Sequence, residues 1–214
     1  MGVEGAHLFD ALLRDFFIDK HRLWIVDHRM SKARCEILQE YIDTYFEPII
    51  EKFSELNGLV HLSLRNEGFF FRTYPYYEIV VNSKRLPDLS AERLRFVTAY
   101  MLAYFSLHAR GQRIIVTNQC EKYYEQCAMF LAFSRGYAED YLLCLTRECS
   151  RQYCDFKSRV NAFKCSEILP FPCNSTNFPS ISQLAAALKC EALRYDYYKP
   201  INLNDAIKRV WAQL

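Results

Sequence analysis

The sequence predicts an α/β or α+β fold, with a mixed sheet of four to five strands, packed helices and an all-helical C-terminal part. The first observation is the alternation of apolar and polar residues from Val60 to Arg65, followed by an aromatic and β-branched run from Phe69 to Val81; both are typical of strands. The second observation is that only helical periodicity is present after Asn118. We therefore expect a sheet-containing part at residues 1–118 and a helical part at 119–214, joined in one compact body.

Four segments have the composition of strands: Leu23–Val26, Val60–Arg65, Phe69–Val81 and Arg113–Asn118. Pro75 interrupts the third segment, and because proline cannot donate a hydrogen bond to a ladder, this run is an edge strand or two short strands. The turn residues Arg65 to Gly68 predict that Phe69 onward folds back antiparallel on the strand before it. An apolar helix precedes Arg113, and this strand–helix–strand order predicts parallel pairing in one sheet.

The most regular predicted helix is capped by Ser31 and closed by Asn57-Gly58. Its apolar residues follow helical spacing, and Pro48 should kink or split it. A second helix, capped by Asp88 or Ser90, is apolar almost all round and should be buried on more than one side.

The remaining predicted helices are Ala6–Ile18, Cys120–Ser134, Ala138–Cys154, Asp155–Ile168, Ser180–Arg194 and Asn204–Leu214. Arg135-Gly136 separates the helix that starts at Cys120 from the next one. Asn202 or Asn204 offers an N-cap for the last helix. Residues 169–179 are rich in proline and form the one clear connector in the sequence.

Composition indicates a globular protein without a strong preference for nucleic acid. Charged residues make up 24% of the 214 residues, and the net charge is +2. No apolar run is long enough to span a bilayer, so we expect no membrane insertion. The nine cysteines are odd in number and lack the regular spacing of a disulfide framework, and the N-terminal segment does not resemble a secretory signal. These features predict reduced thiols in the cytoplasm or nucleus.

Two residues are candidates for catalysis. Cys120 lies at a predicted strand-to-helix junction with Asn118 as N-cap, and the unpaired N–H groups of a helix N-terminus lower a thiol pKa. A small buried thiol explains the same position. His28 follows Asp27 at the end of a predicted central strand, where ligand crevices form in open sheets. A solvated strand end is the alternative explanation for the position of His28. These residues leave open a thiol-dependent enzyme centred on Cys120 as an alternative function.

Cysteines and basic residues gather in the third quarter of the chain. Four residues separate Cys144 from Cys149, and Cys149 from Cys154, which turns successive thiols away from one another on a helix and does not match zinc-knuckle spacing. A metal site would require Cys154, Cys165 and Cys173 to converge across turns; core packing is the alternative. Basic residues with aromatic neighbours can bind phosphates and stack bases, which leaves nucleic-acid binding through helices 147–164 as a further alternative. The residues concerned are Arg147, Arg151, Lys157 and Arg159.

Two surfaces predict partner binding. Acidic residues recur every three or four positions along the helix after Ser31, opposite its apolar stripe, and form either a docking ridge or a solvated face. The aromatic run around Pro75 contains more rings than one side of a strand can bury, and exposed aromatics at a sheet edge are typical anchors of protein contacts. The candidate partner-binding residues are Phe70, Tyr74, Tyr76, Tyr77, Glu40, Glu47 and Glu51.

No phosphate-binding, dinucleotide-binding, zinc-protease, nucleophile-elbow or calcium-loop motif is present, and we expect no cofactor. The sequence therefore favours a non-enzymatic intracellular protein–protein interaction protein, either an adaptor or an assembly subunit. Its partner would be another protein or a second copy of the same chain.

Overall fold

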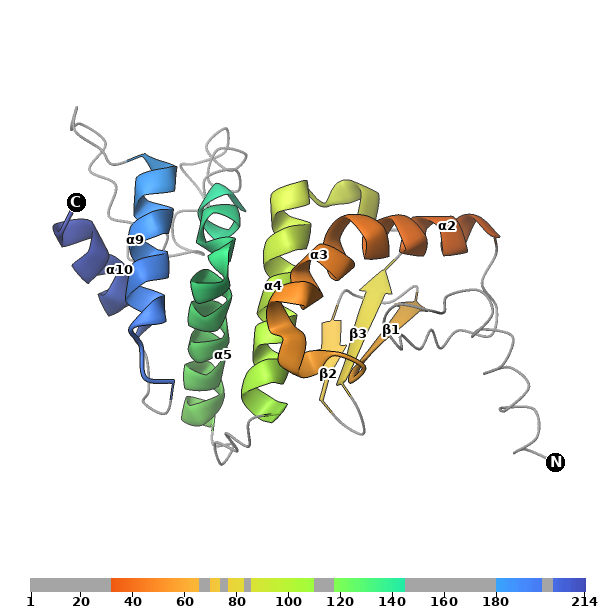
Figure 1. Cartoon of the computed structure of the whole chain (residues 1–214), viewed down its shortest axis with the longest axis horizontal. Coiled ribbons are helices and arrows are strands. Elements are labelled where there is room, and N and C mark those ends of the chain that lie inside the picture. The colour runs from red at the N-terminus through yellow and green to blue at the C-terminus, as the bar shows by residue number, and fades with distance from the viewer. Residues whose placement is uncertain are drawn as a thin grey trace, which may run out of the picture. The chain divides into compact units, whose positions relative to one another are not determined.

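The computed structural model of the chain describes residues 32–65, 70–73, 77–82, 86–109, 118–144, 180–197 and 202–214. By their contacts, the residues divide into two compact units, Met1–Leu89 and Ser90–Leu214 (Figure 1). The described part of the first unit contains a bent helical segment and a small sheet. The described part of the second unit is helical.

The helical segment of the first unit changes its winding three times. Its parts are α2 (Lys32–Tyr41), the π-helical turn η1 (Ile42–Phe46), α3 (Glu47–Ile50) and the 3₁₀ helix η2 (Glu51–Leu56). The change from η1 to α3 occurs beside Pro48, which has no N–H to donate and whose ring crowds the preceding turn. The segment ends at Gly58, where φ is 75°, a left-handed conformation that favours glycine. The predicted break at Pro48 and the predicted end at Asn57-Gly58 are both confirmed.

The sheet of the first unit has three described strands, β1 (Val60–Arg65), β2 (Phe70–Arg72) and β3 (Tyr77–Asn82), in the order β1-β3-β2. β1 pairs with β3 in parallel, and β2 pairs with β3 antiparallel. Successive residues of β3 are buried on both faces of the strand, including Ile79, Val80 and Val81. The prediction that Phe69 onward folds back antiparallel on the preceding strand is wrong, because β2 does not pair with β1 and β3 pairs with β1 in parallel. The run breaks into two strands on either side of Pro75, and its first half pairs with its second half.

The predicted sheet of four to five strands is also wrong. The described residues are predominantly helical, and their sheet has three strands, of which only two are parallel. The predicted strands 23–26 and 113–118 fall on residues that the structure does not describe, except for Asn118, which begins a helix. The apolar helix before Arg113 packs, within the second unit, on the helix that begins at Asn118.

The second unit is an antiparallel arrangement of helices. Its described elements are α4 (Ala91–Ala109), α5 (Asn118–Ala132), the turn η4 (Phe133–Tyr137), helical residues 138–144, α9 (Ile181–Leu193) and α10 (Leu203–Ala212). Figure 1 shows α4, α5 and α9 side by side with alternating directions, and α10 beside α9. The predicted part boundary at residue 118 differs from the contact division at Leu89 and Ser90, because α4 packs on α5.

Local capping signals position these helices. The Ser90 hydroxyl accepts a hydrogen bond from the N–H of Arg93 at 3.3 Å and caps α4. Ser180 and Gln183 form a capping box at the start of α9. The Asn202 side chain accepts a hydrogen bond from the N–H of Asp205 and caps α10. These observations match the predicted helix starts at Ser90, Ser180 and Asn202.

The break at Arg135-Gly136 is likewise confirmed. Gly136 has φ of 99°, which a residue with a side chain adopts only at a cost, and the chain turns here from α5 into helical residues 138–144.

Aromatic rings fill the interior of the second unit. The ring centroid of Phe96 on α4 lies 4.9 Å from that of Tyr141, and the ring centroids of Tyr104 and Tyr124 lie 4.5 Å apart. Ring contacts continue through α5 to the residues after α9, and the participating rings are Tyr124, Tyr104, Tyr100, Phe96, Tyr141, Phe133, Phe130, Tyr195 and Tyr197. Within the described parts of the chain, no helix combines the length and the apolar character needed to cross a membrane.

Candidate functional site

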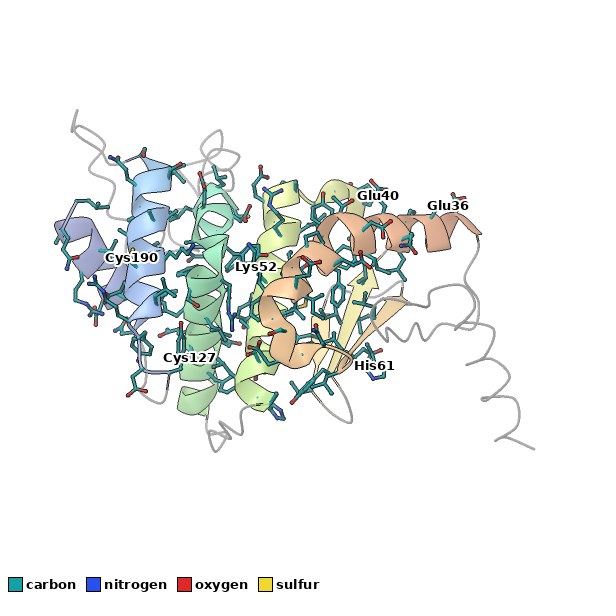
Figure 2. The ribbon with its side chains drawn as sticks, in the orientation of Figure 1. Glu36, Glu40, Lys52, His61, Cys127 and Cys190 are labelled. Carbon is teal, nitrogen blue, oxygen red and sulfur yellow. The ribbon has the colours of Figure 1, made fainter. Side chains whose placement is uncertain are left out.

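The most distinct surface of the first unit is an acidic face on the helical segment 32–56. It consists of Glu36, Glu40, Asp43, Glu47, Glu51 and Glu55. Of these carboxylates, Glu47 and Glu55 are half-buried and the others are exposed. Figure 2 shows Glu36 and Glu40 projecting from α2. The opposite side of the segment is buried and apolar, and it comprises Leu38, Tyr41, Ile42, Phe46, Ile49, Ile50, Phe53 and Leu56.

The acidic face forms because acidic residues and apolar residues each recur with helical spacing, on opposite sides of the segment. Acidic residues follow one another at three or four positions, so they share one side of the segment across the bend. The amide Nε2 of Gln39 donates a hydrogen bond to Asp43 Oδ1 at 2.6 Å and helps to hold this carboxylate at the surface. Between Glu36 and Asn57 the sequence contains six carboxylates and one cation, Lys52. The acidic face therefore carries a local excess of negative charge.

This charge has a cost for the isolated segment. Like charges three or four residues apart on a helix destabilise it by about 0.2–0.5 kcal/mol per pair. Glu36 and Glu40 form such a pair within the regular turns of α2. A basic surface that covered the acidic face would remove this repulsion and replace it with attraction.

The aromatic residues predicted at the sheet edge are described in part. Tyr77 begins β3, which is the central strand of the described sheet and not an edge strand. Its side chain is half-buried, and this burial raises the pKa of its hydroxyl. Phe71 of β2 is also half-buried and is the register partner of Ile79. Tyr74 and Tyr76 lie outside the described residues, and for Phe70 only the backbone in β2 is described. The predicted aromatic contact surface therefore stays a prediction.

A buried carboxylate on β3 was not singled out by sequence reasoning. Glu78 is 2% exposed and lies on the central strand, where its register partners are His61 on β1 and Arg72 on β2. Burial lowers the pKa of His61, and the nearby Glu78 carboxylate opposes part of that effect. Burial therefore favours the neutral form of the His61 imidazole.

An ion pair links two elements of the second unit. Arg95 Nε on α4 lies 2.8 Å from Asp140 Oδ1 on helical residues 138–144, with the two side chains 40% and 14% exposed. Burial raises the pKa of Asp140, although the hydrogen bond from Arg95 acts in the opposite direction. Burial, together with the Asp140 carboxylate, also raises the pKa of Tyr137 to about 12. The Arg95–Asp140 ion pair joins α4 to helical residues 138–144, and its two charges neutralise each other.

The residues predicted for chemistry are mostly outside the described chain. Cys120 lies in the first turn of α5, whose first residue is Asn118, but its side chain is not among those described. The following predicted site residues are outside the described residues altogether: His28, Cys154, Cys165, Cys173, Arg147, Arg151, Lys157 and Arg159. Their proposed roles stay predictions.

Three cysteines with described side chains lie outside disulfide bonds: Cys127 is buried, Cys144 is half-buried and Cys190 is exposed. Among the described residues, no group of three or more histidine, cysteine or acidic side chains is arranged to hold a metal ion.

Comparison with known proteins assigns no family, since no protein-family model, no curated protein and no solved structure matches the chain. Function is therefore argued from the chemistry of the surface.

Proposed function

We propose that the chain is a non-enzymatic intracellular protein–protein interaction protein, an adaptor or an assembly subunit, whose acidic face binds a basic surface of its partner. One observation carries this proposal: a continuous set of carboxylates lies on the exposed side of a helical segment whose other side is buried.

The acidic face contributes to binding mainly through its charge. Complementary charges steer a partner toward the correct orientation and raise the association rate, and exposed pairs add only about 0.2–1 kcal/mol each to affinity. The complex should therefore weaken as salt is added, because the Debye length falls from about 10 Å at 0.1 M to about 3 Å at 1 M. A salt-dependent complex of moderate affinity fits a reversible adaptor.

The aromatic sheet edge belongs to the same proposal as a second contact. Tyr77 and Phe71 expose part of their rings on strands β3 and β2. Apolar rings beside a charged face would supply the buried anchors that a charge-only contact lacks. Phe70, Tyr74 and Tyr76 are the further rings proposed for this contact.

The proposal is tested by removing charge from the acidic face. The variant Glu40→Gln/Asp43→Asn/Glu51→Gln keeps size and hydrogen-bonding capacity while it removes three charges. The full-length tagged chain is purified from cells at low salt, and the proteins that accompany it are quantified by mass spectrometry. We expect the variant to lose the proteins that wild type retains.

A matched control removes three exposed charges elsewhere, with Asp88→Asn, Glu125→Gln and Asp196→Asn. It should retain the same proteins as wild type. Equal retention by the acidic-face variant and the control would contradict a role for the acidic face. A chain that retains no protein at low salt would contradict the proposed function itself.

A further inference from the structure

The helix α9 presents an outer face with apolar and basic side chains. The outer face of α9 consists of Ala186, Lys189, Cys190, Leu193 and Arg194, all of which are exposed. Leu193 is 64% exposed, the highest value among the large apolar residues that the structure describes. Ala186, Cys190 and Leu193 follow at four and three positions, so they lie in one row along the helix (Figure 2 labels Cys190).

The charges of this face have one sign. Lys189 and Arg194 flank the apolar row, and the outer face contains no carboxylate. Glu191, two positions after Lys189, is directed to α10, where its Oε1 lies 3.3 Å from Arg209 Nη2. Asp196, two positions after Arg194, is exposed beyond the end of α9. An occupant that fits this face must therefore supply negative charge around an apolar contact.

A surface of that kind exists on the first unit. The acidic face carries the carboxylates, and Leu59, which follows directly after the end of its helical segment, is 46% exposed. The two units also carry net charges of opposite sign. Residues 1–89 contain 11 basic and 14 acidic residues, and residues 90–214 contain 16 basic and 11 acidic residues.

We propose that the outer face of α9 docks on the acidic face of a second copy of the chain, so that copies associate head to tail. This inference rests on the proposed function and names the basic partner of the acidic face. The two faces differ from each other, so the contact is heterologous, and repetition closes a ring or extends a chain of copies. Both surfaces are small and charged at their margins, which predicts weak association that depends on protein concentration and salt.

The test uses charge reversal on each face separately, in the full chain. Lys189→Glu/Arg194→Glu reverses the outer face of α9, and Glu40→Lys/Glu51→Lys reverses the acidic face. Sedimentation velocity at low salt should show concentration-dependent association of wild type. Each variant alone should associate about tenfold more weakly, since two exposed attractions become repulsions.

Mixing the two variants distinguishes head-to-tail docking from other arrangements. The α9 variant still has a normal acidic face, and the acidic-face variant still has a normal α9. In their mixture the normal acidic face meets the normal α9 and the reversed α9 meets the reversed acidic face, so the two variants should alternate and restore the association that each lacks alone. A chain that carries both reversals has complementary faces again and should regain association.

The control Arg93→Glu/Arg135→Glu reverses two cations elsewhere in the second unit and should associate as wild type does. Cys190→Ser should also associate, which separates docking from disulfide cross-linking. Wild type that stays monomeric at all concentrations, or association that survives reversal of α9, would overturn the inference. If the Glu40→Gln/Asp43→Asn/Glu51→Gln variant nevertheless loses its accompanying proteins, the proposed function stands and only the identity of the partner is refuted.

Discussion

Replacing Glu40 by lysine should stabilise the free chain, although it should impair binding. Glu36 and Glu40 are exposed and lie one turn apart on α2. The substitution removes one repulsion of about 0.2–0.5 kcal/mol and creates an attraction of similar size, with the acid N-terminal to the base as the favourable order. The expected gain is therefore about 0.4–1 kcal/mol in the free energy of unfolding. Glu40→Gln should give about half of it. Glutamate, glutamine and lysine have similar helix propensities, so propensity does not contribute to the difference.

Urea unfolding followed by circular dichroism measures this gain, with unchanged slopes showing that the unfolded states are comparable. Repeating the titration at about 1 M NaCl, where the Debye length is about 3 Å, should remove most of the difference. A loss of stability at low salt would refute the reasoning, because it would mean that the Glu40 carboxylate makes a structural contact. A gain that is equal at both salt concentrations would refute the electrostatic origin.

Other expectations concern the cores of the two units. Gly136→Ala should destabilise the second unit by about 1–2 kcal/mol, because φ of 99° is costly for a residue with a Cβ; thermal unfolding measures this. For His61, burial lowers the folded-state pKa, so the unfolded state binds the proton more tightly and stability falls as the pH decreases below the unfolded value of about 6.5. His61→Gln should therefore lose less stability than wild type between neutral and mildly acidic pH in urea titrations. Tyr137 and Tyr195, whose pKa values are both raised to about 12, should ionise later than exposed tyrosines in an ultraviolet titration, and Tyr137→Phe should reduce the amplitude of that late step. A titration unchanged by Tyr137→Phe would contradict the burial of its hydroxyl.

Helix boundaries could be predicted from sequence wherever local chemistry decides them. Ser90, Ser180 and Asn202 cap their helices through hydrogen bonds to nearby backbone N–H groups. Gly58 and Gly136 have the positive φ values that end helices. These signals depend on a few consecutive residues, and they do not require knowledge of what packs on the helix.

Pairing and packing could not be predicted from the same patterns. The aromatic run around Pro75 has the composition of strands, but composition does not specify that β2 pairs with β3 and not with β1. The apolar helix α4 was expected to cover a sheet, yet its broad apolar surface is equally suited to the helix α5 on which it packs. Alternation places Glu78 on the face of β3 opposite Ile79 and Val81, and it does not indicate that this second face is buried as well.

The candidate surface was predictable to the extent that it depends on helical spacing. The spacing placed Glu40 and Glu51 opposite the apolar stripe, and the structure has both exposed with the stripe buried. The spacing could not reveal the bend through η1 and η2, which depends on the turns around Pro48. The exposed row on α9 was not identified from the sequence, although Leu193 follows the buried Leu188 by five positions and the buried Ala192 by one, a spacing that places it outside their row.

Carboxylate footprinting tests the role of the acidic face most directly. Carbodiimide labelling of the free chain and of the natively purified complex compares the reactivity of Glu40, Asp43 and Glu51 with that of Glu125 and Asp205, which are exposed in the second unit. Binding through the acidic face predicts that the first three become protected in the complex while Glu125 stays reactive. Equal labelling of Glu40, Asp43 and Glu51 with and without the bound protein would contradict it.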